Sequence, residues 1–265
     1  MRLQGGIFDI DGVLLDTPHE RAWREALEEL MSGPWRAVAP QTTYTPSAFT
    51  NAVYQEQIAG KTREAGAEAA LAHYQIPNTD GARTREYAAA KQQILERLAA
   101  SGDVHVYDDA LRFLLEAKAA GVRVCAASSS KNADGFLRAL TVGAFTATHG
   151  LRYPFVTEAT TLLDLFDANV DGRDVAHGKP DPALFLAAAQ ALGVTPQRCF
   201  VVEDAPAGIQ AAKAGGMYAI GVARHHDSDA LRAAHADLVT VHLDEREVAA
   251  LLYGDPIRAE ERAEA

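Results

Sequence analysis

Short apolar runs alternate along the chain with longer segments in which apolar residues recur at helical spacing. Runs typical of β-strands lie at residues 6–8, 122–127, 199–202, 219–223 and 238–241, with a weaker one at 167–170. Helical patterns separate them, which predicts an α/β fold with a Rossmann-like parallel sheet and helices on both faces. Because such sheets bind ligands beyond the carboxyl ends of their strands, we expect the functional groups there.

The helices of this α/β part have clear boundary signals. A pattern at about 109–120 stops at Gly121. In the segment KPDPALFLAAAQALG, Asp181 is the predicted N-cap, Pro182 the first helical residue and Gly193 the stop. A short helix in PAGIQAAKAGG is expected to end at its two glycines, 215 and 216.

Residues 16–104 break the alternation, since almost no strand signal occurs there. Helical patterns occupy residues 19–31, 46–60, 64–74 and 84–100. We therefore predict a core domain formed by residues 1–15 and 104–265, with an all-helical domain, residues 16–103, inserted after the first strand. The sheet is expected to resume near Val104, and the charged tail at 257–265 to fray.

Composition narrows the class of protein. The 265 residues are 48% hydrophobic and 23% charged, as in a globular domain, and the net charge of -11 argues against nucleic acid and anionic membranes as partners. No signal peptide or apolar run long enough to span a membrane is evident, so we expect a cytoplasmic protein. Cys125 and Cys199 lie in apolar runs and are expected to be buried free thiols.

Polar residues cluster where the predicted strands end. They are Asp9 and Asp11 after the first strand, Ser128 to Asn132 after the second, Lys179 in HGKPDP, and Glu203 and Asp204 after residues 199–202. Each set alone has an ordinary explanation as a turn former, helix cap or solvated charge. Four such sets along one sheet predict a shared site.

The motifs FDIDGV, ASSSKN, GKPDP and VVEDAPAGIQAAKAGG resemble, in this order, the four motifs of the haloacid-dehalogenase-like hydrolases. The resemblance covers nearly the whole chain, and the helical insert matches the cap domain of that superfamily. Within it, the sequence is most similar to β-phosphoglucomutase and its relatives. The motif set is specific for the superfamily and less specific for the substrate.

The resemblance implies phosphoryl transfer through an aspartyl-phosphate. Asp9 would be the nucleophile, and Asp11 the general acid and base. Ser128 would hydrogen-bond a phosphoryl oxygen, and Lys179 would neutralise its charge.

The resemblance also implies Mg²⁺ as cofactor, which would offset the repulsion between the paired acids. Its ligands would be the Asp9 carboxylate, the backbone carbonyl of Asp11, Asp204 and Glu203. Haloacid dehalogenases as a group lack the second acid, and phosphonatases have a small residue there. Asp11 therefore favours transfer between oxygens over either of these reactions.

A mutase needs a second anion site, and the likeness to β-phosphoglucomutase extends to residues that form one. In AGKTRE, Arg63 matches a distal-phosphate arginine. Further predicted substrate-binding residues are Thr17, His19, Lys91, Ser130, Lys131 and Asn132. His19 matches a hinge histidine thought to couple cap closure to the acid/base aspartate, and Lys91 a cap lysine that faces the sugar. The alternative interpretation is that Arg63 and Lys91 are ordinary solvated charges on helices and that His19 takes no part in catalysis.

The sequence departs from the family pattern twice. The hinge segment DTPHERAW is about two residues shorter than usual, which bears on the reach of His19. Residues 141–165 form a longer connection than usual, which we expect at the amino edge of the sheet as a structural element or oligomer contact.

The leading hypothesis is interconversion of a sugar 1-phosphate and 6-phosphate through a bisphosphate. Alternatives are a Mg²⁺-dependent sugar-phosphate phosphatase and a non-catalytic sugar-phosphate binding protein. A small-molecule sugar phosphate is the expected partner, and the protein is expected to be a monomer or a weak homo-oligomer.

Overall fold

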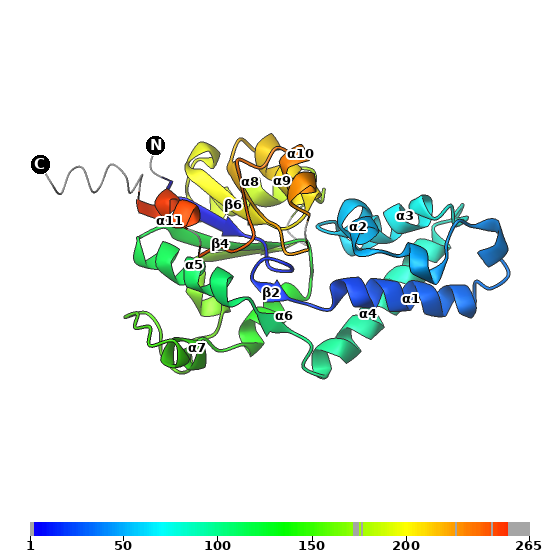
Figure 1. Ribbon diagram of the computed structural model, residues 1–265, viewed down its shortest axis with the longest axis horizontal. Coiled ribbons are helices and arrows are strands. Elements are labelled where there is room, and N and C mark those ends of the chain that lie inside the picture. Colours follow the sequence, from blue (N-terminus) through cyan, green and yellow to red (C-terminus); the bar gives the residue numbers. More distant parts are fainter. Residues whose placement is uncertain (1–2, 172–174, 176, 226, 245, 254–265) are drawn as a thin grey trace, which may run out of the picture.

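Six parallel strands form the sheet at the centre of the α/β part of the molecule (Figure 1). The computed structural model describes residues 3–171, 175, 177–225, 227–244 and 246–253, so the predicted tail at 257–265 lies outside the described residues. The sheet order is β5-β4-β1-β6-β7-β8. The strands are β1 (Gly5–Phe8), β4 (Arg123–Ser128), β5 (Ala168–Asp171), β6 (Cys199–Glu203), β7 (Tyr218–Val222) and β8 (Leu238–Thr240). The predicted fold class is confirmed, and each predicted strand of the sheet lies within two residues of its observed bounds.

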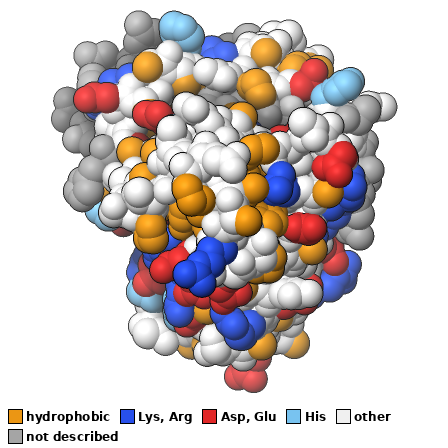
Figure 2. Space-filling view, turned by 90° about the vertical axis from the view of Figure 1, so that its right-hand side faces the viewer, with side chains coloured by type: hydrophobic (Ala, Val, Ile, Leu, Met, Phe, Trp, Pro, Cys, Tyr) orange, Lys and Arg blue, Asp and Glu red, His pale blue; other side chains and the backbone are white. Residues whose placement is uncertain are grey.

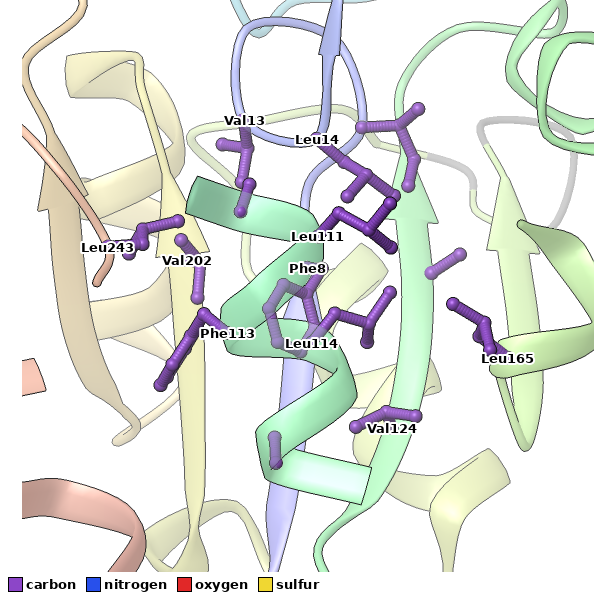
Figure 3. Packing of buried hydrophobic residues seen from close by; sticks show 14 of the residues in the cluster. Phe8, Val13, Leu14, Leu111, Phe113, Leu114, Val124, Leu165, Val202 and Leu243 are labelled. Carbon is purple, nitrogen blue, oxygen red and sulfur yellow. The ribbon is translucent and has the colours of Figure 1, made fainter. Parts of the chain in front are cut away.

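Helices cover both faces of this sheet, because alternate strand residues point to opposite sides. One face carries α5 (Asp108–Ala119), α6 (Ala133–Ala139) and α11 (Arg246–Tyr253), and the other carries α8 (Ala183–Leu192), α9 (Pro206–Ala214) and α10 (Ser228–Ala233). Figure 3 shows the first of these interfaces, where the Phe8 ring centroid lies 5.8 Å from that of Phe113. The neighbouring residue Ile7 points into the second cluster.

The helical segment lies between β2 (Leu15–Asp16) and β3 (His105–Val106), at one end of the sheet (Figure 1). Its α-helices are α1 (His19–Ser32), α2 (Asn51–Val53), α3 (Arg63–His73) and α4 (Ala82–Ala100). They enclose a hydrophobic cluster of their own, centred on Trp23, Leu27 and Tyr87. On the face seen in Figure 2, which looks onto this end of the molecule, acidic and basic side chains are interspersed with hydrophobic ones.

Two predictions about this segment were wrong in detail. Residues 46–60 do not form one helix but three short elements, at Pro46–Ala48, Asn51–Val53 and Tyr54–Ile58, because Thr50 starts a new turn by accepting the Val53 N–H. Near Val104 the chain does not rejoin the main sheet. Instead β3 pairs with β2 in an antiparallel ribbon, so the two connections to the helical segment run side by side.

The boundary of α8 differs from the prediction by one residue. The helix begins at Ala183, whose N–H is accepted by the Asp181 carboxylate at 2.9 Å, so Pro182 lies just before the first turn. Gly193 ends the helix with a φ of +61°, as expected for a glycine stop. The glycine stops of α5 and α9 are also confirmed.

The segment 141–165 packs along the outer side of α5 and contains α7 (Gly143–Thr148). Lys118 Nζ lies 5.9 Å from the ring centroid of Phe155, and His149 Nε2 lies 3.5 Å from Asp108 Oδ2. The segment therefore extends to the start of α5. The prediction that it lies at the amino edge of the sheet was wrong in this respect. Its apolar residues hold it there, because they join the same buried cluster as α5.

Two further properties follow from burial and helix composition. Cys125 and Cys199 are buried free thiols, and burial raises the pKa of Cys125 to about 12 and that of Cys199 to about 11. Among the described residues, no helix has both the length and the apolar character needed to cross a membrane.

Candidate active site

The carboxyl ends of three neighbouring strands meet at the edge of the sheet that faces the helical segment. Phe8, the last residue of β1, is paired with Ala126 of β4 and Val202 of β6. The residues just beyond these pairs therefore share one edge: Asp9 after β1, Ser128 at the end of β4, and Glu203 at the end of β6.

Lys179 is the buried cation among these acids. Its Nζ lies 2.5 Å from Asp9 Oδ1 and also donates a hydrogen bond to Glu203 Oε1. Burial opposes the charged form, but the carboxylates of Asp9 and Glu203 outweigh it and raise the pKa of Lys179. The lysine is therefore held as an ammonium directly beside Asp9.

Three buried carboxylates form a compact oxygen cluster. Asp9, Glu203 and Asp204 each offer an oxygen, and these oxygens lie within 4.8 Å of one another. Burial raises the pKa of Asp9 and of Asp204 well above the usual range, and the charge of Glu203 adds to this. Hard carboxylate oxygens are the donors that Mg²⁺ prefers, so this cluster fits a divalent cation. The backbone carbonyl of Asp11, the fourth predicted donor, remains a prediction.

Two glycines leave room for this cluster, and the sequence did not single them out as site residues. Gly12 has a φ of +88°, and a Cβ there would lie 2.0 Å from Asp204 Oδ2. A Cβ at Gly208 would lie 1.9 Å from Glu203 Oε1. A side chain at either position would push into a carboxylate of the cluster.

Asp11 lies outside the cluster, with partners from both parts of the chain. Thr17 Oγ1 donates to its Oδ1 at 3.0 Å, and Ser128 Oγ donates to its Oδ2 at 3.3 Å. His19 Nε2 lies 3.3 Å from Asp11 Oδ1, although without hydrogen-bond geometry. The short hinge therefore still lets His19 reach Asp11.

His19 and Lys91 form a buried pair in the helical segment. Lys91 Nζ lies 2.9 Å from His19 Nδ1 and 5.2 Å from the ring centroid of Trp23. Burial, followed by the charges of Lys91 and Arg63, lowers the pKa of His19 to about 4, so the imidazole is neutral near pH 7. With Nδ1 accepting from Lys91, Nε2 carries the proton and faces Asp11. Burial also lowers the pKa of Lys91 to about 7.

An outer cavity of about 850 Å³ opens beside this pair. The described cationic side chains that line it are Lys61, Arg63 and Lys91 from the helical segment, and Lys131 from the core. Ser130 and Asn132 also line it. An inner cavity of about 50 Å³ is bounded by Asp9, Asp11, Ser128 and Lys179. His19, Trp23, Lys61, Ser129 and Ser130 line both cavities, so the inner chamber adjoins the outer one.

The helical segment is closed against the core by polar contacts. Ser129 Oγ donates to the Gly60 carbonyl at 2.8 Å. The amides of Gln92 and Asn132 bond reciprocally, at 3.0 and 3.2 Å. Asn132, a predicted substrate-binding residue, is therefore already engaged in this closed arrangement.

A model of the haloacid dehalogenase-like hydrolase family matches residues 6–216. The chain belongs to this family. It is 32% identical over 226 residues to a β-phosphoglucomutase of Bacillus subtilis, a match covering 82% of this chain and 81% of that protein. It is 43% identical over 100 residues to a validoxylamine A 7'-phosphate phosphatase of Streptomyces hygroscopicus, covering 37% of this chain and 46% of that protein. Its fold is similar to the crystal structure of an archaeal β-phosphoglucomutase from Pyrococcus, with a TM-score of 0.64, 29% identity and coverage of 95% and 100%.

All catalytic and metal-binding residues predicted for this haloacid dehalogenase-like hydrolase lie around the inner cavity or its carboxylate cluster. The predicted substrate-binding residues line the outer cavity, except Thr17, which lies at Asp11. Sequence reasoning missed Lys61 and Tyr54, which also line the inner cavity. Lys61 stands two residues before Arg63, and this spacing was the available signal. Burial and the charges of Asp204 and Asp11 raise the pKa of Tyr54 well above its usual value, so its hydroxyl keeps its proton.

Proposed function

We propose that the protein transfers phosphoryl groups on a sugar phosphate, with interconversion of β-glucose 1-phosphate and glucose 6-phosphate as the leading activity. The outer cavity carries this proposal, because Arg63, Lys91 and Lys131 line it but not the inner cavity with the nucleophile, and they come from both the helical segment and the core. A phosphatase for small substrates has no need of cations there. A sugar that carries phosphate at either end needs these cations, because they hold the phosphate that is not reacting in each orientation of the sugar.

The first half-reaction uses Asp9 and Asp11. An oxygen of Asp9 attacks phosphorus, the bond from phosphorus to the sugar oxygen breaks, and Asp11 gives a proton to that leaving oxygen. Lys179 stabilises the negative charge on the transferring group, since its ammonium is fixed 2.5 Å from Asp9. Ser128 orients a phosphoryl oxygen.

The second half-reaction passes the phosphoryl group from Asp9 to the unphosphorylated end of a sugar monophosphate, which becomes the bisphosphate. The bisphosphate then gives the phosphate at its other end to Asp9. Asp11, now a carboxylate, takes the proton from the incoming hydroxyl as that oxygen attacks the aspartyl-phosphate of Asp9. The uncharged His19 lies 3.3 Å from Asp11 in the closed arrangement, where it can orient Asp11 toward the chamber. Closure also excludes the water that would otherwise hydrolyse the intermediate.

We assign the Mg²⁺ site to Asp9, Glu203 and Asp204, with the backbone carbonyl of Asp11. When bound, the ion offsets the charge of the carboxylates and of the phosphoryl oxygens. The buried trio of carboxylate oxygens within 4.8 Å supports this assignment.

The distal phosphate is assigned to Arg63 and Lys131, with Ser130 and Asn132. Within the described part of the chain, neither Arg63 nor Lys131 has an ion-pair partner, so both cations are available to an anion in the cavity they line. Lys91 is assigned to the sugar. We further propose that residues 16–103 act as a cap that opens and closes over a core of residues 1–15 and 104–265.

The second candidate is a Mg²⁺-dependent sugar-phosphate phosphatase. The sequence identity to the Streptomyces phosphatase favours this candidate. That identity is higher than the identity to the Bacillus mutase, although the match is shorter. The two activities use the same core and differ in whether water or a sugar hydroxyl attacks the intermediate.

One assay separates them. The protein is supplied with β-glucose 1-phosphate, a glucose bisphosphate primer and Mg²⁺, and glucose 6-phosphate and free phosphate are followed together. The proposal expects glucose 6-phosphate to form faster than phosphate, with a strong dependence on the primer. Release of phosphate without glucose 6-phosphate would establish the phosphatase, and binding without either product would leave a sugar-phosphate binding protein.

A further inference from the structure

A second large cavity, of about 490 Å³, reaches the acids of the site from the hinge side. Asp11 and Asp204 line it, whereas none of the four predicted metal-binding acids lines the outer cavity. Since Asp204 is one of the three clustered carboxylates, the second cavity adjoins that cluster directly. With the helical segment closed, the buried cluster is therefore approached from two different sides.

The two approaches differ in charge. Among the residues that the structure describes, the outer cavity has four lysine or arginine side chains and two acidic ones. Within the same described part of the chain, the hinge cavity has five acidic side chains and two arginines. The acids are Asp11, Asp16, Glu20, Asp103 and Asp204.

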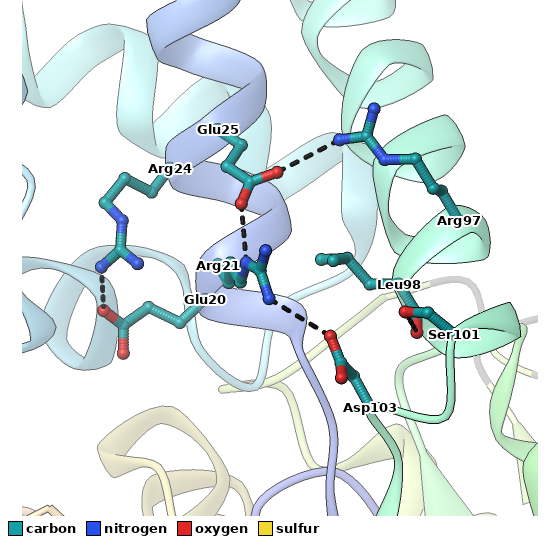
Figure 4. A network of polar contacts seen from close by, with 8 residues as sticks. All are labelled: Glu20, Arg21, Arg24, Glu25, Arg97, Leu98, Ser101 and Asp103. Atoms are coloured by element: carbon teal, nitrogen blue, oxygen red, sulfur yellow. Dashed lines mark hydrogen bonds and ion pairs between the residues drawn. The ribbon is translucent and has the colours of Figure 1, made fainter.

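The two arginines of the hinge cavity are already paired. Arg24 Nη1 lies 3.3 Å from Glu20 Oε1, and Arg21 Nη1 lies 3.2 Å from Asp103 Oδ2, as Figure 4 shows. Within each pair the positive and negative charges cancel. The cavity therefore remains negative because of Asp16 and the acids of the site, Asp11 and Asp204. A divalent cation is attracted into such a cavity, and a sugar phosphate is repelled from it.

A polar group in the wall of this cavity has no hydrogen-bond partner among the residues described. Gln55 lines the cavity, its side chain is only 4% exposed, and its Oε1 accepts no hydrogen bond from any described residue. A buried amide oxygen without a partner is costly, so a ligand that satisfies it gains free energy. Amide oxygens bind hard divalent cations directly or through the water that Mg²⁺ retains.

We propose that the hinge cavity is the entry route for the divalent cation, separate from the outer cavity through which the sugar phosphate enters. Asp16 attracts the hydrated ion at the mouth, Gln55 accepts a hydrogen bond from its water, and Asp204 receives it at the cluster. The ion can then exchange while the outer cavity is occupied. This inference rests on the proposed function only for the identity of the ion.

Binding kinetics of Mn²⁺ test this route without any turnover, so the result does not depend on which reaction the protein catalyses. Mn²⁺ quenches tryptophan fluorescence, and Trp23 lines the inner cavity. Stopped-flow mixing gives the association rate constant for the wild type and for Asp16→Asn, Gln55→Leu and Glu64→Gln. Glu64 is the matched control, because it is an exposed acid like Asp16 but lines the outer cavity.

We expect Asp16→Asn to slow association by about two- to fivefold at low ionic strength, with the difference vanishing near ~0.5 M salt. Gln55→Leu is expected to slow association at every ionic strength, and Glu64→Gln to leave it unchanged. Equal rates for Asp16→Asn and the wild type, or equal slowing by Asp16→Asn and Glu64→Gln, would overturn the proposal. Asp16 is exposed, so its variant decides the question even if Gln55→Leu does not fold.

Discussion

Replacing Lys91 with methionine should stabilise the ligand-free protein and weaken its response to a phosphorylated ligand. Lys91 is 2% exposed and its ammonium has no carboxylate partner among the described residues, only His19 and the face of Trp23. Keeping a buried cation charged without a carboxylate partner costs stability, in keeping with the proposed role of Lys91 in binding the sugar. Methionine keeps the apolar stem against Trp23 and removes the charge.

The size of this gain in stability follows from the pKa of Lys91. Burial lowers the pKa of Lys91 from 10.5 to about 7. At ~1.4 kcal/mol for each pH unit, charging Lys91 disfavours the folded state by roughly 5 kcal/mol at pH values below 7. The variant loses the hydrogen bond to His19 and the contact of the cation with Trp23, each worth about 1 kcal/mol. Water in the outer cavity reduces the cost of burying the Lys91 charge further. We therefore expect Lys91→Met to raise the free energy of unfolding by about 1–3 kcal/mol.

Thermal unfolding at pH 6.5 measures this gain, at about 2–4 °C for each kcal/mol in a protein of this size. Lys131→Met is the matched control, because Lys131 lines the same cavity but is exposed, and its Tm should not change. Glucose 6-phosphate should raise the Tm of the wild type more than that of Lys91→Met, because the ligand's anion favours the charged form of Lys91.

The pH dependence has a definite sign. The unfolded chain binds the Lys91 proton up to its pKa of 10.5 and the folded chain only up to about 7, so this group makes wild-type stability rise with pH between these values. The advantage of Lys91→Met is therefore largest below pH 7 and declines toward pH 10. A variant less stable than the wild type at pH 6.5, with a difference that does not change at pH 10, would refute the assigned burial cost.

Three further predictions concern the site itself. Asp9→Asn should abolish phosphoryl transfer and leave the circular dichroism spectrum and the Tm nearly unchanged, because the amide keeps the shape but cannot attack; a well-folded active variant would contradict the covalent mechanism. Gly12→Ala should lower stability by roughly 2 kcal/mol or more and weaken Mn²⁺ binding, because its Cβ would meet Asp204 Oδ2 at 2.0 Å; Gly102→Ala, with a similar φ of +92° and no atom within 4 Å, isolates the part due to backbone strain. Arg63→Ala should slow the mutase reaction on the order of ten- to a hundredfold, with hydrolysis of a small aryl phosphate nearly unchanged, and equal losses in the two assays would identify Arg63 as a stability residue.

The sheet and the inner chamber could be predicted because their signals are local. Each strand is a short apolar run, and Asp9, Lys179 and Glu203 stand at fixed places relative to a strand end or a helix start. Parallel pairing then brings the strand ends to one edge whatever the rest of the chain does.

What the sequence could not supply depends on contacts between distant segments. Strands β2 and β3 are too short for any periodic pattern, and they exist because the two connections pair. Gln92 contacts Asn132 only because the helical segment closes on the core, and the sequence does not show this closure. The pKa values of His19 and Lys91 likewise arise from burial that no spacing along the chain reveals.

If Asn132 binds substrate as proposed, its reciprocal bond with Gln92 makes closure and substrate capture compete for the same amide. A ligand phosphate that binds Asn132 would then meet a group that already has a partner, so the ligand-free closed form would act as an intramolecular inhibitor. Measured affinity is then the intrinsic affinity reduced by the fraction of molecules in which the amide is free. Selection for tighter closure at position 92 would therefore protect the intermediate from water and raise the substrate concentration needed for half-maximal rate.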